Sequence, residues 1–389
     1  MVLLGTTITR APYAADPARS RGRRYPEPAP RFRSEFQRDR DRIIHCSAFR
    51  RLEYKTQVFV NHEGDLFRTR LTHTLEVAQI GRTVARVLGL NEDLLEAITL
   101  AHDLGHTPFG HAGQNALNTC MKPYGGFEHN LQSIRIVDEL EERYADFAGL
   151  NLTFETREGI LKHCSRAKAA ELGELGKRFL ERTQPSLEAQ LANLADEIAY
   201  SSHDIDDGLR AGLLSIDQMR QAPLVGALFA RVERETPALP ERRLTYQVVR
   251  HLINDLVTDL IETSHRAIQD AQVADIDEVR RHPEPLIRFS DPVRRELRRL
   301  KSFLFRNLYR HHRVYRMVSK SKRIVTALFE AFFADPLLLP PQQQARLAAL
   351  EAEQGPAGRA RAVADYIAGM TDRFAIAEHQ RLFDPLRLT

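Results

Sequence analysis

Three histidines and one aspartate gather within segment 101–113, which reads AHDLGHTPFGHAG. His102 and Asp103 are adjacent, and His106 and His111 follow beyond a turn that glycine and proline favour. Imidazole and carboxylate groups are frequent ligands of divalent transition metals. Neighbouring side chains on the last turn of a helix diverge by about 100°, so the first two can flank one ion. We therefore interpret the segment as part of a metal site rather than as a polar helix cap.

A second polar face lies far along the chain, in the helix expected at 186–210. Asp196, Tyr200 and Asp204 are spaced four residues apart, so all three lie on one face of that helix. The flanking residues are apolar, and burying an unpaired carboxylate is unfavourable. Asp196 is therefore a candidate ligand or partnered carboxylate.

The elements that must position these residues are helices. The apolar stripe of 72–90 begins beside His73 and ends near Gly89, and Asn91 is a favourable N-cap for the helix that runs towards His102. Convincing alternating strand patterns are nearly absent, so we predict an all-α fold. Further helices are expected at 110–121, 127–143, 155–164, 171–182, 186–210, 215–233, 244–269, 292–309, 311–333, 342–351 and 357–381.

The composition is that of an ordinary globular protein. The chain has 389 residues, of which 43% are hydrophobic and 28% are charged. It contains neither a run of about eighteen apolar residues nor a signal-peptide core. Cys46, Cys120 and Cys164 are isolated, which argues against a disulfide framework or a zinc ribbon. We therefore expect a cytoplasmic protein with reduced thiols and no membrane partner.

Three regions differ in composition. Residues 1–35 are rich in arginine and proline and predict a basic, flexible arm. Residues 36–210 hold the candidate site residues and predict a catalytic core, on which a helical region at 211–389 is expected to pack. Within that region, 294–323 contain twelve lysines and arginines and only one acid, Glu296. This is either a solvated basic face or a surface for a phosphate, a nucleotide effector or single-stranded nucleic acid.

Six motifs, taken in order, resemble those of the bacterial deoxyguanosinetriphosphate triphosphohydrolase-like proteins, within the HD superfamily of metal-dependent phosphohydrolases. With the helices between them, they cover residues from about 35 to 380. A His-Asp pair alone carries little information, whereas six motifs in the family's order are specific. The motifs are FRRLEYKTQVF (49–59), RTRLTHTLEVAQI (68–80), AHDLGHTPFGHAG (101–113), FEHNLQS (127–133), LADEIAYSSHDIDD (194–207) and DYIAGMTDRFA (365–375).

The resemblance implies a multi-helical HD-domain fold and a homo-oligomer. It also implies hydrolysis of a deoxynucleoside triphosphate, dGTP or several dNTPs, to a deoxynucleoside and tripolyphosphate. One divalent metal ion, Mn, Mg, Co, Fe or Zn, would be held by His73, His102, Asp103 and Asp196. Mixed nitrogen and oxygen ligands with open positions suit such ions, which polarise a phosphoryl oxygen and orient a water.

The resemblance assigns roles to further residues. His111 corresponds to the family's catalytic histidine, and the poor 5′-oxygen leaving group needs a general acid. His106 and His129 correspond to histidines that contact the triphosphate or support proton transfer. Arg70 corresponds to an arginine near the phosphates, whose geometry a guanidinium matches. The positions that correspond to sugar contacts are Gln57, Tyr200 and Asp204.

Gln114 departs from the family pattern. The family often has an acid at this position, three residues after the catalytic histidine and paired with it. A glutamine can orient His111 by hydrogen bonding but cannot stabilise its charged form as a carboxylate would. Either another acid such as Glu128 substitutes, or the rate is lower, or His111 plays a different part.

Two other functions fit the same residues. One is a different HD phosphohydrolase, such as a 5′-nucleotidase or a phosphodiesterase. The other is a non-catalytic HD protein that keeps the metal site in order to bind a nucleotide or nucleic acid. Product analysis separates these two functions from dNTP triphosphohydrolysis. Only a triphosphohydrolase yields tripolyphosphate, and a non-catalytic protein yields no product.

Overall fold

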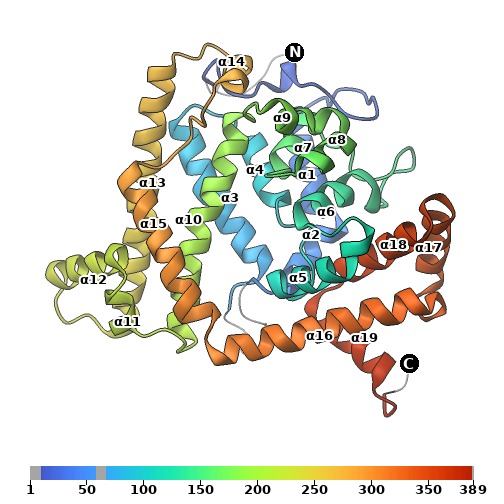
Figure 1. Cartoon of the computed structure of the whole chain (residues 1–389). Coiled ribbons are helices and arrows are strands. Elements are labelled where there is room, and N and C mark those ends of the chain that lie inside the picture. The colour runs from blue at the N-terminus through green and yellow to red at the C-terminus, as the bar shows by residue number, and fades with distance from the viewer. Residues whose placement is uncertain (1–9, 58–66, 388–389) are drawn as a thin grey trace.

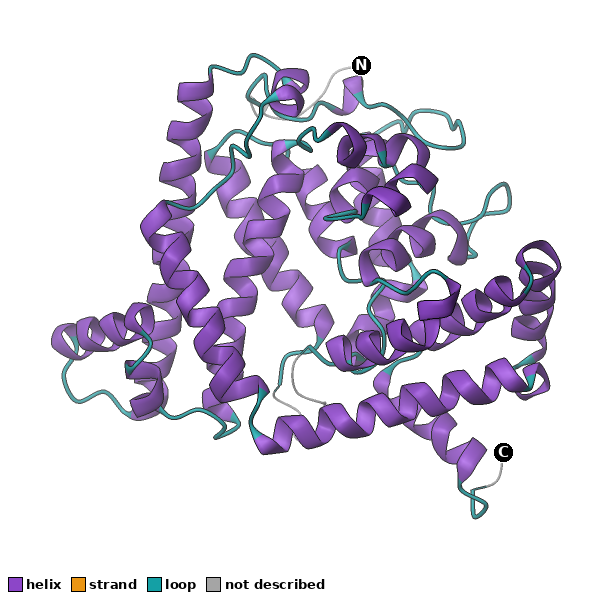
Figure 2. Cartoon of the chain, viewed as in Figure 1, coloured by secondary structure: helices purple, strands orange, loops and turns teal. Residues whose placement is uncertain are grey.

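The computed structural model describes residues 10–57 and 67–387, and helices connected by loops make up this part of the chain (Figures 1 and 2). No strand occurs among these residues, where only two isolated bridges join Arg23 to Thr153 and Thr56 to Thr69. The prediction of an all-α fold is confirmed. In the same part of the chain, no helix has the length and apolar character that a membrane span needs.

The core is built on three packed helices, α3 (Arg70–Val87), α4 (Glu92–Ala101) and α10 (Leu187–Arg210). Thr69 caps α3 by accepting from the backbone of Thr72, so this helix begins slightly before the predicted residue 72. The three helices lie side by side (Figure 1). Their apolar faces meet in one buried core, which fixes the helices against one another.

Shorter helices surround the open side of this layer. The helix predicted at 127–143 ends early, because a π-helical turn at Ile136–Leu140 follows α6, and the one predicted at 171–182 is replaced by two short helices around Gly173. The elements of this part are α1 (Glu35–His45), α2 (Ser47–Arg51), α5 (Gly110–Met121), α6 (His129–Arg135), α7 (Phe154–Ile160), α8 (Arg166–Glu171) and α9 (Lys177–Glu181).

The C-terminal half forms two further groups of helices. The first extends the core along α10 and consists of α11 (Ile216–Arg220), α12 (Pro223–Glu235), α13 (Glu241–Ala271), α14 (Ile276–Arg281) and α15 (Asp291–Leu304). The second packs on α5 and crosses the opposite end of the core (Figure 1). It consists of α16 (His312–Ala334), α17 (Pro341–Gln354), α18 (Pro356–Ala368) and α19 (Asp372–Phe383).

Two helices that the sequence predicts as continuous are broken. The helix predicted at 215–233 restarts at Pro223, which lacks the N–H that a helix interior needs and therefore begins α12. The helix predicted at 357–381 stops at Gly369, and Thr371 then caps α19. After this second break, α19 runs in a different direction from α18 (Figure 1).

The N-terminal arm is not a solvated tail where the structure describes it. Ala14 and Ala15 are buried in the main core. The guanidinium of Arg23 lies 2.6 Å from a carboxylate oxygen of Glu35 and 2.5 Å from one of Asp39. The prediction of a flexible arm is therefore wrong for residues 10–35, because ion pairs and apolar contacts fix this segment to the core. Residues 1–9 lie outside the described part.

Candidate active site

Three core helices bring together the four predicted metal ligands. His73 lies on the first turn of α3, His102 and Asp103 at the end of α4, and Asp196 in the middle of α10. Nε2 of His73 is 3.0 Å from Oδ1 of Asp196, and Nε2 of His102 is 3.1 Å from Oδ1 of Asp103 and 3.6 Å from Oδ1 of Asp196. Two imidazole nitrogens thus face two carboxylate oxygens across a space of metal-ion size.

The turn after α4 is shaped by close backbone packing. A Cβ at Gly105 would lie 2.2 Å from the carbonyl oxygen of His129, so only glycine lets this turn rest on α6. Phe109 and Gly110 then take the left-handed conformation, with φ of 62° and 55°. A Cβ at Gly110 would lie 3.1 Å from the guanidinium of Arg70. The glycines therefore let the turn, α6 and the arginine approach closely.

The protonation of His102 suits a metal ligand. Its Nδ1 lies 2.6 Å from the carbonyl oxygen of Thr99, which can only accept, so this nitrogen carries the proton. Nε2 then offers a lone pair, and it is buried without a hydrogen-bond partner among the described residues. A buried lone pair beside the carboxylates of Asp103 and Asp196 is unfavourable unless a cation lies between them. These residues therefore fit a divalent ion.

Each carboxylate divides its oxygens between the histidines and a basic side chain. Arg70 donates to Oδ2 of Asp103 at 2.6 Å, and Lys162 donates to Oδ2 of Asp196 at 2.6 Å. Burial opposes ionisation of both acids, but the neighbouring His102 ring and the guanidinium of Arg70 hold the pKa of Asp103 well below its usual range. Lys162 and His102 do the same for the pKa of Asp196. Both acids are ionised, with Oδ1 directed at the candidate ion position.

Three of the four metal-ligand candidates, His73, Asp103 and Asp196, line a pocket of about 440 Å³. His102 does not line it but contacts both Asp103 and Asp196. The structure brings all but one of the other predicted site residues to this pocket. The predicted residues that line it, besides the metal-ligand candidates, are Gln57, Arg70, His106, His111, His129 and Tyr200.

Three histidines form one wall of the pocket. The rings of His106 and His129 are stacked with centroids 4.1 Å apart, and the ring of His111 lies 5.8 Å from that of His106. Burial lowers the pKa of His129 to about 3 and the pKa of His106 well below its ordinary value. Partial burial in the pocket and the charge of Arg70 also lower the pKa of His111. The side chain of His111 nevertheless keeps access to solvent. All three are neutral at pH 7.

Gln114 does not orient His111. Its side-chain oxygen lies 2.7 Å from Nδ1 of His129 and accepts from that ring instead. Glu128 is engaged elsewhere, because its carboxylate lies 2.7 Å from Nε2 of His163. The substitution of the missing acid by Glu128 is therefore wrong for this structure, and no hydrogen bond or ion pair joins His111 to another described side chain.

Asp204 lies behind the pocket wall. It is buried, and the hydroxyl of Tyr309 donates to its Oδ2 and also contacts the hydroxyl of Tyr200. Burial raises the pKa of Asp204 to about 7. Sequence reasoning missed Tyr309, which lies in a π-helical turn after α15, and Lys162, which lines the pocket. Neither residue belongs to a local sequence motif that would have indicated a role.

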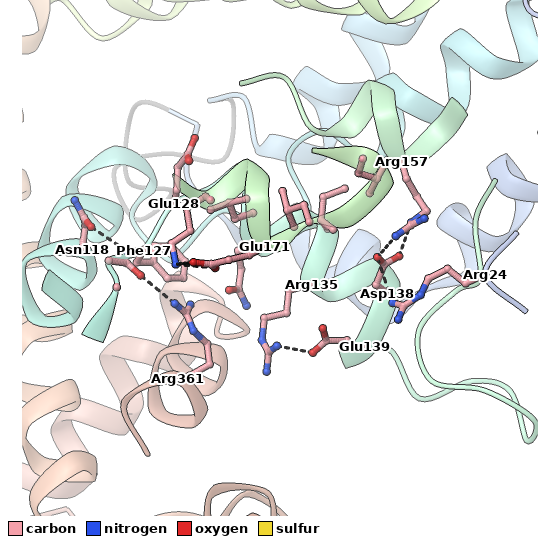
Figure 3. A pocket seen from close by; sticks show the side chains of 18 residues that line it. Arg24, Asn118, Phe127, Glu128, Arg135, Asp138, Glu139, Arg157, Glu171 and Arg361 are labelled. Atoms are coloured by element: carbon pink, nitrogen blue, oxygen red, sulfur yellow. Dashed lines mark hydrogen bonds and ion pairs between the residues drawn. The ribbon is translucent and has the colours of Figure 1, made fainter. Parts of the chain in front are cut away.

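A larger cavity, of about 710 Å³, lies between α5, α6 and α18 (Figure 3). Its side chains neutralise one another, since Arg157 pairs with Asp138 and Arg135 pairs with Glu139. Within the described part of the chain, the cluster of metal-ligating groups is formed by His73, His102 and Asp103, and two of these, His73 and Asp103, line the smaller pocket. The chemistry therefore belongs to that pocket.

Comparison with known proteins agrees with this geometry. Residues 70–201 match the HD domain, and residues 287–381 match the phosphohydrolase-associated domain. Curated proteins named "Deoxyguanosinetriphosphate triphosphohydrolase-like protein" are similar over almost the whole chain. The one from Ralstonia nicotianae is 64% identical over 96% of this chain and 94% of its own length. Those from Bordetella pertussis and Thiobacillus denitrificans are 63% and 60% identical, each over 96% of this chain and 96% and 97% of their own lengths.

The helical core and its His-Asp site define the class as an HD-domain phosphohydrolase. Within that class, the chain belongs to the deoxyguanosinetriphosphate triphosphohydrolase-like family.

Proposed function

We propose that this enzyme hydrolyses deoxynucleoside triphosphates, dGTP or several dNTPs, to deoxynucleoside and tripolyphosphate with a divalent metal ion. The observation that carries the proposal is one pocket in which three of the four metal-ligand candidates lie beside Arg70, Lys162 and three neutral histidines. The fourth candidate, His102, contacts two of those three. The names of the relatives, which specify a deoxynucleoside triphosphate, support the same substrate class.

The basic side chains suit a highly charged substrate. Arg70 and Lys162 line the pocket beside the two ionised acids and compensate the charge of incoming phosphates. A divalent ion held by His73, His102, Asp103 and Asp196, when bound, would supply polarisation of a phosphoryl oxygen and an activated water.

His111 is the residue that we assign to protonate the leaving group. The 5′-oxygen of a deoxynucleoside is a poor leaving group unless it receives a proton. His111 has solvent access and no carboxylate partner among the described residues, so its neutral ring takes up a proton when the negative triphosphate enters and raises its pKa. His106 and His129, stacked behind it, hold the wall in place.

The test is a screen of the four dNTPs and four NTPs with Mn²⁺, Mg²⁺, Co²⁺, Fe²⁺ and Zn²⁺. Products are separated so that tripolyphosphate, pyrophosphate and orthophosphate are resolved. We expect tripolyphosphate from at least one dNTP. Orthophosphate from a monophosphate would assign a 5′-nucleotidase instead, and binding without turnover under every metal would assign a non-catalytic HD protein.

A cytoplasmic location and a homo-oligomeric state belong to the same proposal. The three cysteines are unpaired, as expected in a reducing compartment that holds free dNTPs. Large apolar side chains are exposed near the C-terminal helices, including Leu337 and Phe383, and such side chains suit burial between subunits.

A further inference from the structure

His73 has a second ring nitrogen that points away from the candidate metal position. Its Nδ1 lies 3.1 Å from Nδ1 of His203. On the far side of that ring, Nε2 of His203 is in close contact with Oε2 of Glu76. Both histidines are almost completely buried, with 1% and 2% of their surface exposed. A carboxylate and two imidazoles thus form a continuous chain that ends at the metal site.

The spacing of these residues on two packed helices explains why the chain of contacts forms. His73 and Glu76 are three residues apart on α3, so they lie on adjacent turns of one face. Asp196 and His203 are seven residues apart on α10 and also share a face. Since α3 and α10 pack directly against each other, the contact that places His73 beside Asp196 also places His203 beside Glu76.

The chain of contacts fixes where the protons lie. Of the two Nδ1 atoms, one must donate and the other accept. Glu76 is ionised, since its contacts with His203 and with Arg68, at 3.1 Å, hold its pKa at about 2 against the effect of burial. This carboxylate can only accept, so the proton of His203 lies on Nε2 and its Nδ1 is an acceptor. His73 then donates through Nδ1, which leaves a lone pair on Nε2.

The opposite arrangement would disable the ligand. If His203 donated from Nδ1, the proton of a neutral His73 would lie on Nε2, facing Asp196, and no lone pair would face a metal ion. His102 obtains the correct tautomer from a backbone carbonyl, that of Thr99. His73 obtains it from two side chains, which mutation can remove.

We propose that His203, oriented by Glu76, is a positioning residue that holds His73 in its metal-binding tautomer. Outer partners of this kind are general features of metal-bound histidines, and their loss weakens metal binding by about 10–100-fold. The inference rests on the proposed metal site, and it concerns residues to which neither the family comparison nor the sequence motifs assign a role.

The experiment measures Zn²⁺ affinity of metal-stripped protein by competition with a chelator, with no substrate present. His203→Leu removes the acceptor at nearly constant volume, and we expect binding about 10–100-fold weaker than in the wild type. His203→Asn keeps an oxygen near the position of Nδ1, and we expect affinity within about threefold of the wild type. Glu76→Gln removes the charge that sets the tautomer and is expected to give an intermediate loss.

Glu158→Gln is the matched control, because Glu158 is a buried carboxylate paired with Arg280 outside the site. It is expected to bind Zn²⁺ like the wild type. In ¹⁵N-histidine spectra of the Zn²⁺-loaded wild type, His73 should carry its proton on Nδ1. Circular dichroism shows whether each variant folds. If the His203 variants do not fold, the Glu76→Gln variant and the histidine spectra test the proposal.

Two outcomes overturn the proposal. One is wild-type affinity in both His203→Leu and Glu76→Gln, and the other is equal loss in His203→Leu and His203→Asn. A His73→Ala variant separates this inference from the proposed function. If His73→Ala also binds Zn²⁺ normally, the metal site itself is misassigned, whereas normal binding by the His203 and Glu76 variants alone removes only the positioning role.

Discussion

At the scale of single residues, the site depends on the direction in which each carboxylate oxygen and imidazole lone pair faces. Asp103 and Asp196 each present one oxygen to the histidines and the other to a cationic side chain. Arg70 and Lys162 therefore keep the two acids ionised without occupying the oxygens that face the candidate ion. The arrangement predicts that loss of either a histidine or an acid empties the site.

His102→Ala and Asp196→Ala should strip the metal while the helices stay folded. Each change removes one of the four candidate ligands and leaves the core helices with their apolar faces intact. Metal content measured by plasma mass spectrometry should fall well below one ion per subunit. Wild-type metal content in either variant would refute the ligand set, and His45→Ala, outside the pocket, is the control.

His111→Ala should keep the metal and lose turnover. His111 lines the pocket, and no hydrogen bond or ion pair joins it to the ligand candidates among the described residues, so metal content is expected to match the wild type. Loss of a general acid lowers kcat by about 10²–10⁴-fold. Steady-state kinetics on the preferred dNTP check this, and unchanged turnover would remove His111 from the mechanism.

Asp204 should make stability depend on pH. Burial raises its pKa to about 7, with Tyr309, Tyr200, Asp207 and Arg68 as the surrounding titratable groups. Between about pH 4 and pH 7 the folded state keeps a proton that the unfolded state has lost, so wild-type stability falls as pH rises, by up to about 1.4 kcal/mol per pH unit.

An Asp204→Asn variant lacks this proton and provides the comparison. Urea unfolding at pH 5 and pH 7.5 should show the variant gaining stability relative to the wild type at the higher pH. The same difference in unfolding free energy at both pH values would contradict the raised pKa.

At the scale of elements, the C-terminal helices hold the turn between α4 and α5. Asp372, at the start of α19, accepts from the backbone N–H of Thr56 at 3.0 Å and from that of Phe109 at 2.9 Å. The buried Lys55 donates to the carbonyl oxygens of His106, at 2.5 Å, and Ala368, at 2.8 Å. The turn between His106 and His111 is thus held by two segments from the far end of the chain.

Asp372→Ala should destabilise the protein and displace this turn. It leaves the buried backbone donors of Thr56 and Phe109 without an acceptor, which costs about 1–3 kcal/mol of unfolding free energy. Urea unfolding measures the loss, and kcat should fall while metal content stays near one ion per subunit. Asp384→Ala, beyond the exposed end of α19, should change neither quantity. An Asp372→Ala protein as stable and active as the wild type would show that the turn keeps its position without Asp372.

At the scale of the whole molecule, the basic residues of 294–323 form an exposed surface along α15 and α16. All twelve lysines and arginines are exposed, together with Phe305 and Tyr315. Some charges are paired, as in Lys301 with Glu197 at 2.7 Å. Exposed cations interleaved with aromatic rings suit a polyanion, so we propose single-stranded nucleic acid or a nucleotide effector as the partner.

Fluorescence anisotropy with a labelled single-stranded oligonucleotide tests this surface. We expect binding that weakens as salt rises, and a several-fold loss of affinity in Arg306→Ala and Arg316→Ala. Arg243→Ala, an exposed arginine on α13, is the control. Equal affinity in all three variants would show that this face does not bind the oligonucleotide and is either solvated or a subunit contact. Light scattering on the same samples distinguishes these two cases.

The sequence by itself determined the helical class, the ligand candidates and most of the pocket wall. Apolar residues recur at helical spacing, and side chains such as Thr69 and Asn91 cap the helices that follow them, so these features depend on neighbours in the chain. His102 and Asp103 were recognisable for the same reason, because their motif is local.

Only the tertiary structure decided how distant segments complete the site. Tyr309 reaches Asp204 from a position 105 residues away, and Asp372 reaches Phe109 from 263 residues away. Gln114 on α5 bonds to His129, 15 residues away on α6, rather than to His111 on its own helix, and no spacing within either helix encodes that choice. Such contacts depend on the angles at which helices cross, and those angles are set by the whole core at once.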